Sequence, residues 1–246
     1  MKQHDSKLDL SWVPKGNTVK GVNVLILQFL LSKKKQLNSL FDIPCGDGSF
    51  LFAVKQIFPR AFITGLDLYA QPREDIKELT VKASAKDWPH VQNKNFDIIT
   101  SISGVMAFDD VSGLFERAYQ HLNPNGYFII TNDNILTIRD RLHFLLFGSV
   151  KRFPLCFQTN EGNWNIIMPQ ALWRLGKCNG FELEKVTYHS PRIEDWFWLP
   201  LSIVIYPLQF LYLVLQKTDK TFAEKLKIFP PQILWKRHYI FYFRKI

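Results

Sequence analysis

The stretch that decides the fold is Leu40-Phe41-Asp42-Ile43-Pro44-Cys45-Gly46-Asp47-Gly48-Ser49-Phe50. Apolar residues over 39–43 predict a short strand, and apolar residues along one side of 49–57 predict a helix. The turn between them contains Gly46 and Gly48, which lack a Cβ atom and allow a ligand to approach the backbone closely. The stretch therefore predicts a strand, a tight turn and a helix that together form a ligand site.

The same alternation of strands and helices continues on both sides of this unit. Further strands are predicted over 61–68, 96–101, 127–131 and 181–189, and further helices over 17–36, 111–121 and 169–177. Strands that alternate with helices form a parallel sheet with helices on its faces. The predicted fold class is therefore α/β, a doubly wound, mostly parallel sheet of the Rossmann-like kind, in which ligands bind at the carboxyl ends of the strands.

Two acidic residues and the glycine turn indicate which cofactor the site binds. A dinucleotide-binding fingerprint requires a third glycine three residues after Gly48, where this sequence has Leu51. Asp42 lies inside the strand before the turn, where a carboxylate suits a ligand with an ammonium group. Asp67 ends the next strand, nineteen residues after Gly48, where a carboxylate can accept hydrogen bonds from both ribose hydroxyls. An amino-acid end at Asp42 and a ribose at Asp67 describe S-adenosyl-L-methionine.

Residues 38–131 resemble a class I S-adenosyl-L-methionine-dependent methyltransferase of the small-molecule (type 11) kind. Residues 96–101 are similar to the fourth strand of that family, and 121–130 are similar to the turn that leads into its fifth strand. Within the family pattern, Asp67 is the ribose acid and Leu68 lies beside the adenine. The resemblance implies a cofactor site formed by Asp42, Cys45, Gly46, Gly48, Asp67, Leu68, Ser84, Ala85 and Ser101.

Three positions depart from the family pattern. Pro44 stands where the usual Gly-x-Gly-x-Gly turn has its first glycine. Ser84 stands where the family often has the acid that holds the adenine amino group, and its hydroxyl can still form a hydrogen bond. Met106-Ala107 stands where many relatives carry Glu-His, so that no acid–base pair is offered there. The glycine turn and the ribose acid are retained, and cofactor binding is therefore still predicted.

Two residues after the fifth strand are candidates for the acceptor side. Asp133 lies just past that strand, where contact with the acceptor or a role as base competes with capping of the next helix. His143 lies on a predicted helical stretch, and its alternatives are a catalytic base and a packed histidine. Methyl transfer from a sulfonium needs no base unless the acceptor is a hydroxyl, because positioning and desolvation supply much of the rate. The segment 134–148 resembles a bacterial subgroup associated with cell-envelope glycans and lipid-linked intermediates.

The composition sets further limits. The chain has 246 residues, of which 47% are hydrophobic and 22% charged, which excludes a disordered chain and a polytopic membrane protein. Three cysteines lie far apart without a Cys-x-x-Cys spacing, so that neither a disulfide framework nor a metal site is predicted. The net charge of +9 favours an anionic partner, and +6 of this charge lies within residues 196–246.

This C-terminal part combines an apolar run with basic and aromatic residues. Residues 196–215 contain no charge, and as one helix they would be about 30 Å long, the thickness of a bilayer core. Pro200 and Pro207 would break or kink such a helix, and a single span from a cytoplasmic domain would leave the basic tail outside. The sequence therefore predicts a peripheral anchor on an anionic membrane surface, with head groups bound by Lys217, Lys220, Lys225 and Lys227.

Three other interpretations of the apolar run stay open. One is a buried helix pair or a dimer interface, and the second is a true membrane span. The third is nucleic-acid binding by the basic and aromatic tail over 233–244, which is the least favoured because it gives the apolar run no use.

The predicted organisation is a flexible arm (1–16), an S-adenosyl-L-methionine-binding methyltransferase domain (17–190) and a hydrophobic, basic, membrane-seeking helical extension (191–246). The predicted function is methyl transfer to a small-molecule, glycan or lipid-linked acceptor by a cytoplasmic enzyme bound peripherally to the inner face of the membrane. A methyltransferase-like scaffold without turnover is the alternative, and a nicotinamide-dependent reductase is a more distant one. The sequence leaves the acceptor and the oligomeric state open.

Overall fold

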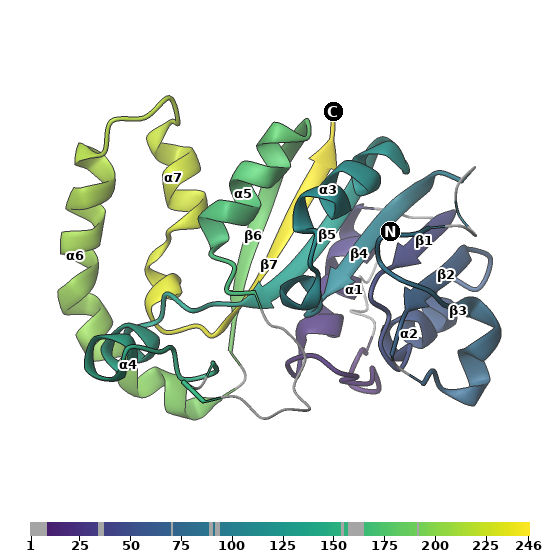
Figure 1. Cartoon of the computed structure of the whole chain (residues 1–246), viewed down its shortest axis with the longest axis horizontal. Helices are drawn as coiled ribbons and strands as arrows, with labels where there is room; N and C mark the ends of the chain where they lie inside the picture. Colours follow the sequence, from purple (N-terminus) through teal and green to yellow (C-terminus); the bar gives the residue numbers. More distant parts are fainter. Residues whose placement is uncertain are drawn as a thin grey trace, which may run out of the picture.

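The centre of the molecule is a seven-stranded sheet with the order β3-β2-β1-β4-β5-β7-β6 (Figure 1). Neighbouring strands are parallel, except that β7 runs antiparallel to both of its neighbours. The predicted α/β class with a doubly wound, mostly parallel sheet is confirmed. The structure, a computed structural model, describes residues 9–33, 37–69, 71–88, 91, 94–153, 155–156, 165–190 and 192–246. The strands are Ser39–Asp42 (β1), Phe62–Asp67 (β2), Thr80–Lys82 (β3), Phe96–Ile102 (β4), Leu122–Asp133 (β5), Phe181–His189 (β6) and His238–Lys245 (β7).

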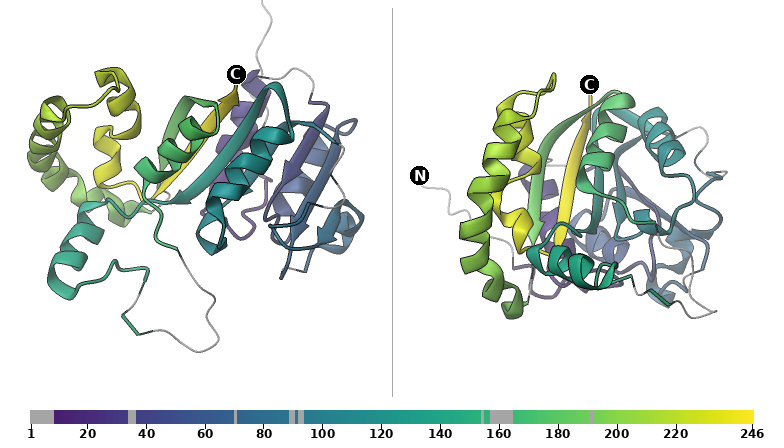
Figure 2. Two further views of the ribbon diagram at one scale, coloured as in Figure 1. Left: turned by 45° about the horizontal axis from the view of Figure 1, so that its top comes forward. Right: turned by 60° about the vertical axis from the view of Figure 1, so that its left-hand side comes forward.

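Helices cover both faces of this sheet (Figures 1 and 2). The buried residues of α1 and α2 belong to one hydrophobic cluster, and those of α3 and α5 belong to the other. α6 and α7 lie beyond the β6 edge, on the left of Figure 1. The helices are Val22–Lys33 (α1), Ser49–Ile57 (α2), Val111–Gln120 (α3), Ile138–Phe147 (α4), Pro169–Cys178 (α5), Leu199–Leu215 (α6) and Phe222–Ile228 (α7).

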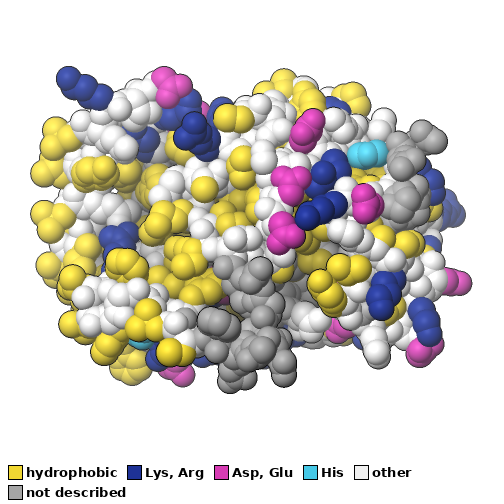
Figure 3. Space-filling view, viewed as in Figure 1, with side chains coloured by type: hydrophobic (Ala, Val, Ile, Leu, Met, Phe, Trp, Pro, Cys, Tyr) yellow, Lys and Arg dark blue, Asp and Glu magenta, His cyan; other side chains and the backbone are white. Residues whose placement is uncertain are grey.

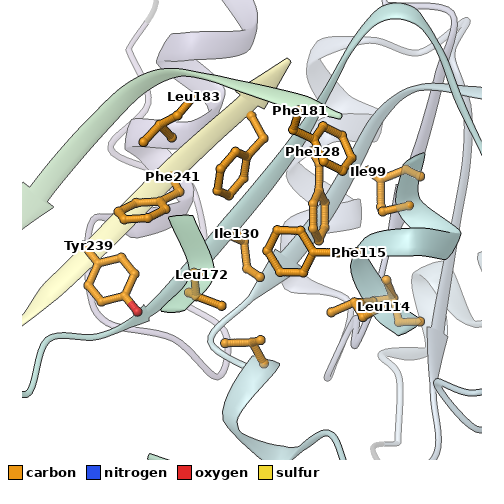
Figure 4. Packing of buried hydrophobic residues seen from close by; sticks show 14 of the residues in the cluster. Ile99, Leu114, Phe115, Phe128, Ile130, Leu172, Phe181, Leu183, Tyr239 and Phe241 are labelled. Atoms are coloured by element: carbon orange, nitrogen blue, oxygen red, sulfur yellow. The ribbon is translucent and has the colours of Figure 1, made fainter. Parts of the chain in front are cut away.

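The two clusters follow from the alternation of side chains along the central strands. In β5, Phe128 belongs to one cluster and Ile129 to the other, and Phe241 and Ile240 divide in the same way in β7. The rings of Phe115 and Phe128 meet edge to face, with centroids 5.1 Å apart (Figure 4). Both faces of the sheet are therefore packed, which leaves the carboxyl ends of the strands as the place for ligands.

The last strand corrects a predicted domain boundary. The sequence predicts that residues 191–246 form a helical extension outside the domain, but β7 lies within the sheet, between β5 and β6. Phe241 pairs with Ile130 of β5 and with Val186 of β6, and residues 239–243 are all buried. A strand buried on both faces shows no alternation of polar and apolar residues. For this reason the sequence of β7 resembles an aromatic tail rather than a strand.

Residues 9–16, the described part of the predicted flexible arm (1–16), contact the domain. Leu10 is buried against the cluster that contains α1 and α2. The side-chain amide of Asn23 donates hydrogen bonds of 2.9 and 3.1 Å to the carbonyls of Pro14 and Lys15. The prediction is therefore wrong for the described part of the arm, and the first eight residues lie outside the described part of the chain.

α6 is one continuous helix in spite of two prolines. Pro200 lies in the first turn, where a missing N–H breaks no helical hydrogen bond, and Pro207 lies inside the helix. At the other end, Nζ of Lys225 donates hydrogen bonds of 2.8 and 2.7 Å to the carbonyls of Leu213 and Gln216. These bonds satisfy carbonyls that a helix end leaves without a partner. Lys225 is therefore buried against α6 and does not reach out as the predicted head-group cation.

Replacing Phe241 by alanine should strongly destabilise the fold, because the ring is fully buried within the sheet. Truncation of a buried phenylalanine costs about 3–5 kcal/mol. We expect a loss of this size in the free energy of unfolding, measured by urea denaturation with circular dichroism. Phe147→Ala is the matched control, because this ring is 59% exposed and its loss should cost less than about 0.5 kcal/mol. Equal stabilities of the two variants would contradict the place of β7 in the sheet.

Candidate functional site

The turn between β1 and α2 is shaped by its two glycines. Gly46 and Gly48 have positive φ angles of 55° and 75°, which glycine adopts without strain. A Cβ atom on Gly48 would overlap the side chain of Ile76, and one on Gly46 would lie 3.2 Å from the side-chain nitrogen of Asn17. The turn is therefore closely enclosed, and its backbone is the surface that it presents to a ligand.

Asp67, at the end of β2, is held against this turn. One carboxylate oxygen accepts a hydrogen bond of 2.9 Å from the N–H of Gly46, and the other accepts one of 2.9 Å from the N–H of Tyr69. The backbone thus orients the carboxylate in the way that a contact with two neighbouring ribose hydroxyls requires.

Asp42, at the end of β1, is a buried carboxyl group. Its exposed fraction is 1%, and its Oδ1 accepts a hydrogen bond of 2.6 Å from the hydroxyl of Thr100. Burial raises the pKa of Asp42 to about 8, and the negative charge of Asp67 contributes to this, whereas the bond from Thr100 opposes it. A buried carboxylate is costly unless a cation pairs with it. The site therefore favours a positively charged group, in agreement with the predicted ammonium contact.

Two cavities meet at Asp67 and Tyr69. One, of about 310 Å³, contains Asp42, and the other, of about 600 Å³, contains Leu68. The order from Asp42 through Asp67 to Leu68 is the order of the amino-acid, ribose and adenine parts of S-adenosyl-L-methionine. We call these two cavities together the cofactor groove. The predicted cofactor residues that line it are Asp42, Cys45, Gly46, Asp67, Leu68, Ser84 and Ala85.

The other two predicted cofactor residues do not line this groove. Gly48 shapes the turn, and Ser101 is fully buried within β4. β4 continues to Ile102, so that Ser103 is the serine that reaches the groove. Cys45 lines the groove, and burial raises the pKa of its thiol, which keeps the sulfur protonated and favours packing over nucleophilic chemistry.

A third cavity, of about 720 Å³, adjoins the Asp42 end of the groove and is called the acceptor cavity here. Lys15, Asn17, Thr18 and Ser103 line both the acceptor cavity and the cofactor groove, so that they form a shared wall. The hydroxyls of Thr18 and Ser103 lie 2.6 Å apart. Ser103 has a φ angle of 55°, which is uncommon outside glycine, and its N–H donates a 2.8 Å hydrogen bond to Oγ1 of Thr131.

Asp133, a predicted acceptor-side residue, lines the acceptor cavity. Its Oδ1 forms an ion pair with Arg152 and lies 3.1 Å from Nδ1 of His238. Burial lowers the pKa of His238 to about 3, and the positive charge of Arg152 contributes, so that the ring is neutral at pH 7. The second ring nitrogen of His238 lies 3.5 Å from Oγ of Ser103. Polar contacts therefore connect Asp133 through His238 with Ser103 of the shared wall.

Local contacts distinguish the alternatives for the two catalytic candidates. The N-cap of α4 is Thr137, whose side chain accepts a hydrogen bond from the helix backbone, so that Asp133 does not cap this helix. Nδ1 of His143 lies 2.6 Å from the carbonyl of Ser149, and its ring packs on Phe147 with centroids 4.9 Å apart. His143 lines neither the groove nor the acceptor cavity. The structure thus brings Asp133, but not His143, to the site.

Sequence reasoning missed three contributions to this site. Ser103 follows a strand, and the rule that ligands bind beyond strand ends could have found it. His238 was missed together with β7, because only a long-range pairing brings it beside Asp133. Residues 15–18 carry no local pattern that marks them as a wall of two cavities.

Comparisons with known proteins identify the family of this chain. A family model described as a methyltransferase domain matches residues 19–186. Among solved structures, the chain is similar to mycolic acid cyclopropane synthase CmaA1 complexed with SAH and CTAB, at 16% identity and a TM-score of 0.57 over 90% of this chain and 84% of that chain. It is also similar to a SAM-dependent methyltransferase from Archaeoglobus fulgidus, at 17% identity and a TM-score of 0.55 over 91% and 93%.

A third similar structure is geranyl diphosphate C-methyltransferase from Streptomyces coelicolor A3(2) in complex with Mg²⁺, geranyl diphosphate and S-adenosyl-L-homocysteine, at 14% identity and a TM-score of 0.53 over 91% and 79%. At these identities the structural likeness establishes the fold alone. No curated protein sequence gives a significant match.

The family match covers more than half of the chain and includes the glycine turn, Asp42 and Asp67. This match rules out the more distant interpretation as a nicotinamide-dependent reductase. It is consistent with Leu51, which stands where a dinucleotide-binding fingerprint requires a glycine. Two of the three similar structures hold S-adenosyl-L-homocysteine, the demethylated form of the cofactor that the groove fits. The chain belongs to the class I methyltransferases, which use S-adenosyl-L-methionine as the methyl donor.

Proposed function

We propose that this methyltransferase modifies a small-molecule, glycan or lipid-linked acceptor at the inner face of the cytoplasmic membrane. The observation that carries the proposal is the wall shared by the cofactor groove and the acceptor cavity, with Thr18 and Ser103 at its centre. Methyl transfer is an in-line displacement, in which the acceptor atom must lie against the methyl group. A cavity that adjoins the amino-acid end of the groove offers that position.

Different residues of the groove would bind different parts of the cofactor. Asp42 would bind the ammonium group, Asp67 the ribose hydroxyls, and Leu68, Ser84 and Ala85 the adenine. S-adenosyl-L-methionine, when bound, supplies a methyl group activated by the sulfonium charge. Because the leaving group is already good, the protein's contribution is to hold the two reactants in line and to exclude water.

The acceptor side is assigned to Asp133 and its surroundings. Asp133 lines the acceptor cavity, and the neutral ring of His238 connects it with Ser103. Two of the similar structures hold small amphiphilic molecules, CTAB in one and geranyl diphosphate in the other. These ligands support a small or lipid-linked acceptor for this chain.

The membrane part of the proposal rests on a surface formed by α4 and α6, called the apolar face here. Figure 3 shows hydrophobic side chains gathered on the left of the molecule, where Figure 1 draws these helices. A 2.8 Å hydrogen bond from Arg141 of α4 to Gln209 of α6 joins the two. Large exposed apolar patches mark protein or lipid interfaces. The apolar face consists of Phe144, Leu145, Leu146, Phe147, Ile203, Val204, Leu208, Leu211 and Leu215, all more than half exposed.

A peripheral position suits this surface better than a span. The described chain has one helical stretch long and apolar enough to cross a membrane, Ile193–Leu215, and 11% of its most apolar window is buried. The hydroxyl of Tyr206 donates a 3.2 Å hydrogen bond to the carbonyl of Phe229, which ties the middle of α6 to the segment after α7. Trp196 and Tyr212 are at least half exposed and suit the interfacial region.

Asp67→Ala should strongly weaken the binding of S-adenosyl-L-methionine, measured by calorimetric titration into the purified protein. Lost hydrogen bonds to a charged group cost about 1.5–3 kcal/mol each, so that the dissociation constant should rise at least about tenfold. Asp67→Asn keeps an acceptor for the N–H of Gly46 and separates ligand contact from turn geometry. Glu116→Ala, an exposed carboxylate on α3, is the matched control and should bind normally. Folded wild-type protein that binds no cofactor would favour a scaffold instead.

Cofactor binding should release a proton near pH 7, because the pKa of Asp42 is raised to about 8 in the free protein and an ammonium partner favours the carboxylate. The affinity should therefore rise with pH up to about 8 and level off above it, by up to about tenfold per pH unit. Titrations in buffers with different ionisation enthalpies measure the proton release. Asp42→Asn should bind more weakly, and its affinity should lose this dependence on pH. Proton uptake, or an affinity that is flat from pH 6 to 8 in the wild type, would contradict the ammonium contact.

Replacing exposed leucines on the apolar face by glutamine should release the protein from vesicles. Leu145→Gln with Leu146→Gln removes two side chains that are 77% and 70% exposed, so that folding should be unaffected. Each buried leucine contributes at least about 1.5 kcal/mol, and the pair should weaken binding about a hundredfold. Flotation with vesicles of phosphatidylcholine and phosphatidylglycerol measures this binding. Ile246→Gln, at a side chain that is 76% exposed outside the apolar face, is the control. Unchanged flotation, or a dimer that the substitutions dissociate, would overturn the membrane assignment.

A further inference from the structure

The acceptor cavity is strongly basic. The described residues that line it include seven cationic side chains and two carboxylates. Positive residues come to it from the N-terminal segment, from α4, from the segment after α4, from the segment after β6 and from the residue before β7. The cations are Lys15, Lys20, Arg139, Lys151, Arg152, Arg192 and Arg237.

Among the residues that the structure describes, ion pairs neutralise two of these cations. Arg152 pairs with Asp133, and Arg237 pairs with Asp195 and Glu194, neither of which lines the cavity. The second carboxylate of the lining, Asp140, is buried and accepts a 2.6 Å hydrogen bond from the hydroxyl of its neighbour Thr137. No ion pair within the described part of the chain involves the five other cations, Lys15, Lys20, Arg139, Lys151 and Arg192.

An excess of positive charge around a concave site is costly without an anion. Like charges repel, and low-dielectric walls concentrate their field within the cavity. At Arg152, burial lowers the pKa to about 10, and repulsion by the neighbouring positive charge of Arg237 contributes to this shift. Only Lys15 among the unpaired cations also lines the cofactor groove, so that the cofactor's own carboxylate can account for one of the five.

We propose that the acceptor cavity binds a phosphate or diphosphate group of the methyl acceptor, held by Arg139, Lys151 and Arg192. A carboxylate carries one charge, whereas a phosphate monoester or diphosphate carries two or more and has several oxygens for the planar donors of arginine. The charge excess and the presence of arginines on separate segments therefore favour the phosphorylated class. The inference rests on the proposed function, since it names the acceptor that this cavity would present to the cofactor.

The position of Arg139 connects this site with the apolar face. Arg139 lies in the first turn of α4, and Leu145 and Leu146 lie in the second half of the same ten-residue helix. A lipid-linked phosphate could therefore have its head in the acceptor cavity and its chain along α4. A soluble phosphorylated compound would use the cavity alone, and the two sources share the same anion chemistry.

The test is calorimetric titration of two probes, inorganic pyrophosphate and dodecyl phosphate below its micellar concentration, into the full chain without cofactor. Arg139→Gln and Lys151→Gln should each weaken probe binding at least about tenfold. Neither side chain makes an ion pair within the described residues, so that both variants should fold, which normal binding of S-adenosyl-L-methionine checks. Arg60→Gln and Arg174→Gln, two exposed arginines outside the cavity, are the matched controls and should leave probe binding unchanged.

Each outcome decides the proposal. Weaker probe binding in the cavity variants alone supports the phosphate site. Tighter binding of dodecyl phosphate than of pyrophosphate would indicate a lipid-linked acceptor, and tighter binding of pyrophosphate would indicate a soluble one. Failure of both probes to bind the folded wild type, or equal weakening in the controls, overturns it. Dodecyl maltoside, which has the same chain and a neutral head, must not compete with the probes. Probe binding by a chain that does not bind S-adenosyl-L-methionine would refute the proposed function and leave the phosphate site standing.

Discussion

The insertion of β7 between β5 and β6 is the constraint on which the rest of the molecule depends. Because β7 runs against the other strands, its first residue lies at their carboxyl edge, where His238 pairs in register with Asp133 and with His189. This register also brings Arg237 to the same edge. The last element of the chain thus completes a site whose cofactor part is built from the first elements. The helices α6 and α7 form the connection between β6 and β7, so that the chain enters and leaves them at the sheet.

The two parts of the site have opposite electrostatic character. The cofactor groove presents Asp42 and Asp67, which suit a cationic ligand, whereas the acceptor cavity has an excess of positive charge. A sulfonium on one side of the shared wall and an anion on the other would attract each other across it. Their attraction would favour the close approach that an in-line displacement needs.

Local patterns predicted the cofactor part of the site, and long-range pairing decided most of the rest. The unit from β1 through α2 was predictable because a glycine turn and its two acids lie within a short segment, Asp42 to Asp67. β7 was not, because a strand buried on both faces has no alternating pattern. The convergence of Lys15, Arg139 and Arg192 was also hidden, since the sequence shows the number of charges and not their position. The sequence predicted the end of β4 at Ser101, one residue early, and it did not identify Ser103.

The hydroxyl contact between Thr18 and Ser103 joins the N-terminal segment to the end of β4, and both residues line two cavities at once. The segment that contains Thr18 therefore borders both cavities at the place where they adjoin, and it does not cover one of them alone. Under the proposed function, a substitution in it would change the dissociation constants of the methyl donor and of the acceptor together, and kinetics measured for one ligand alone would assign the effect to the wrong side. Evolution of a new acceptor specificity along this wall is constrained in the same way, since each change must also keep the methyl donor in place.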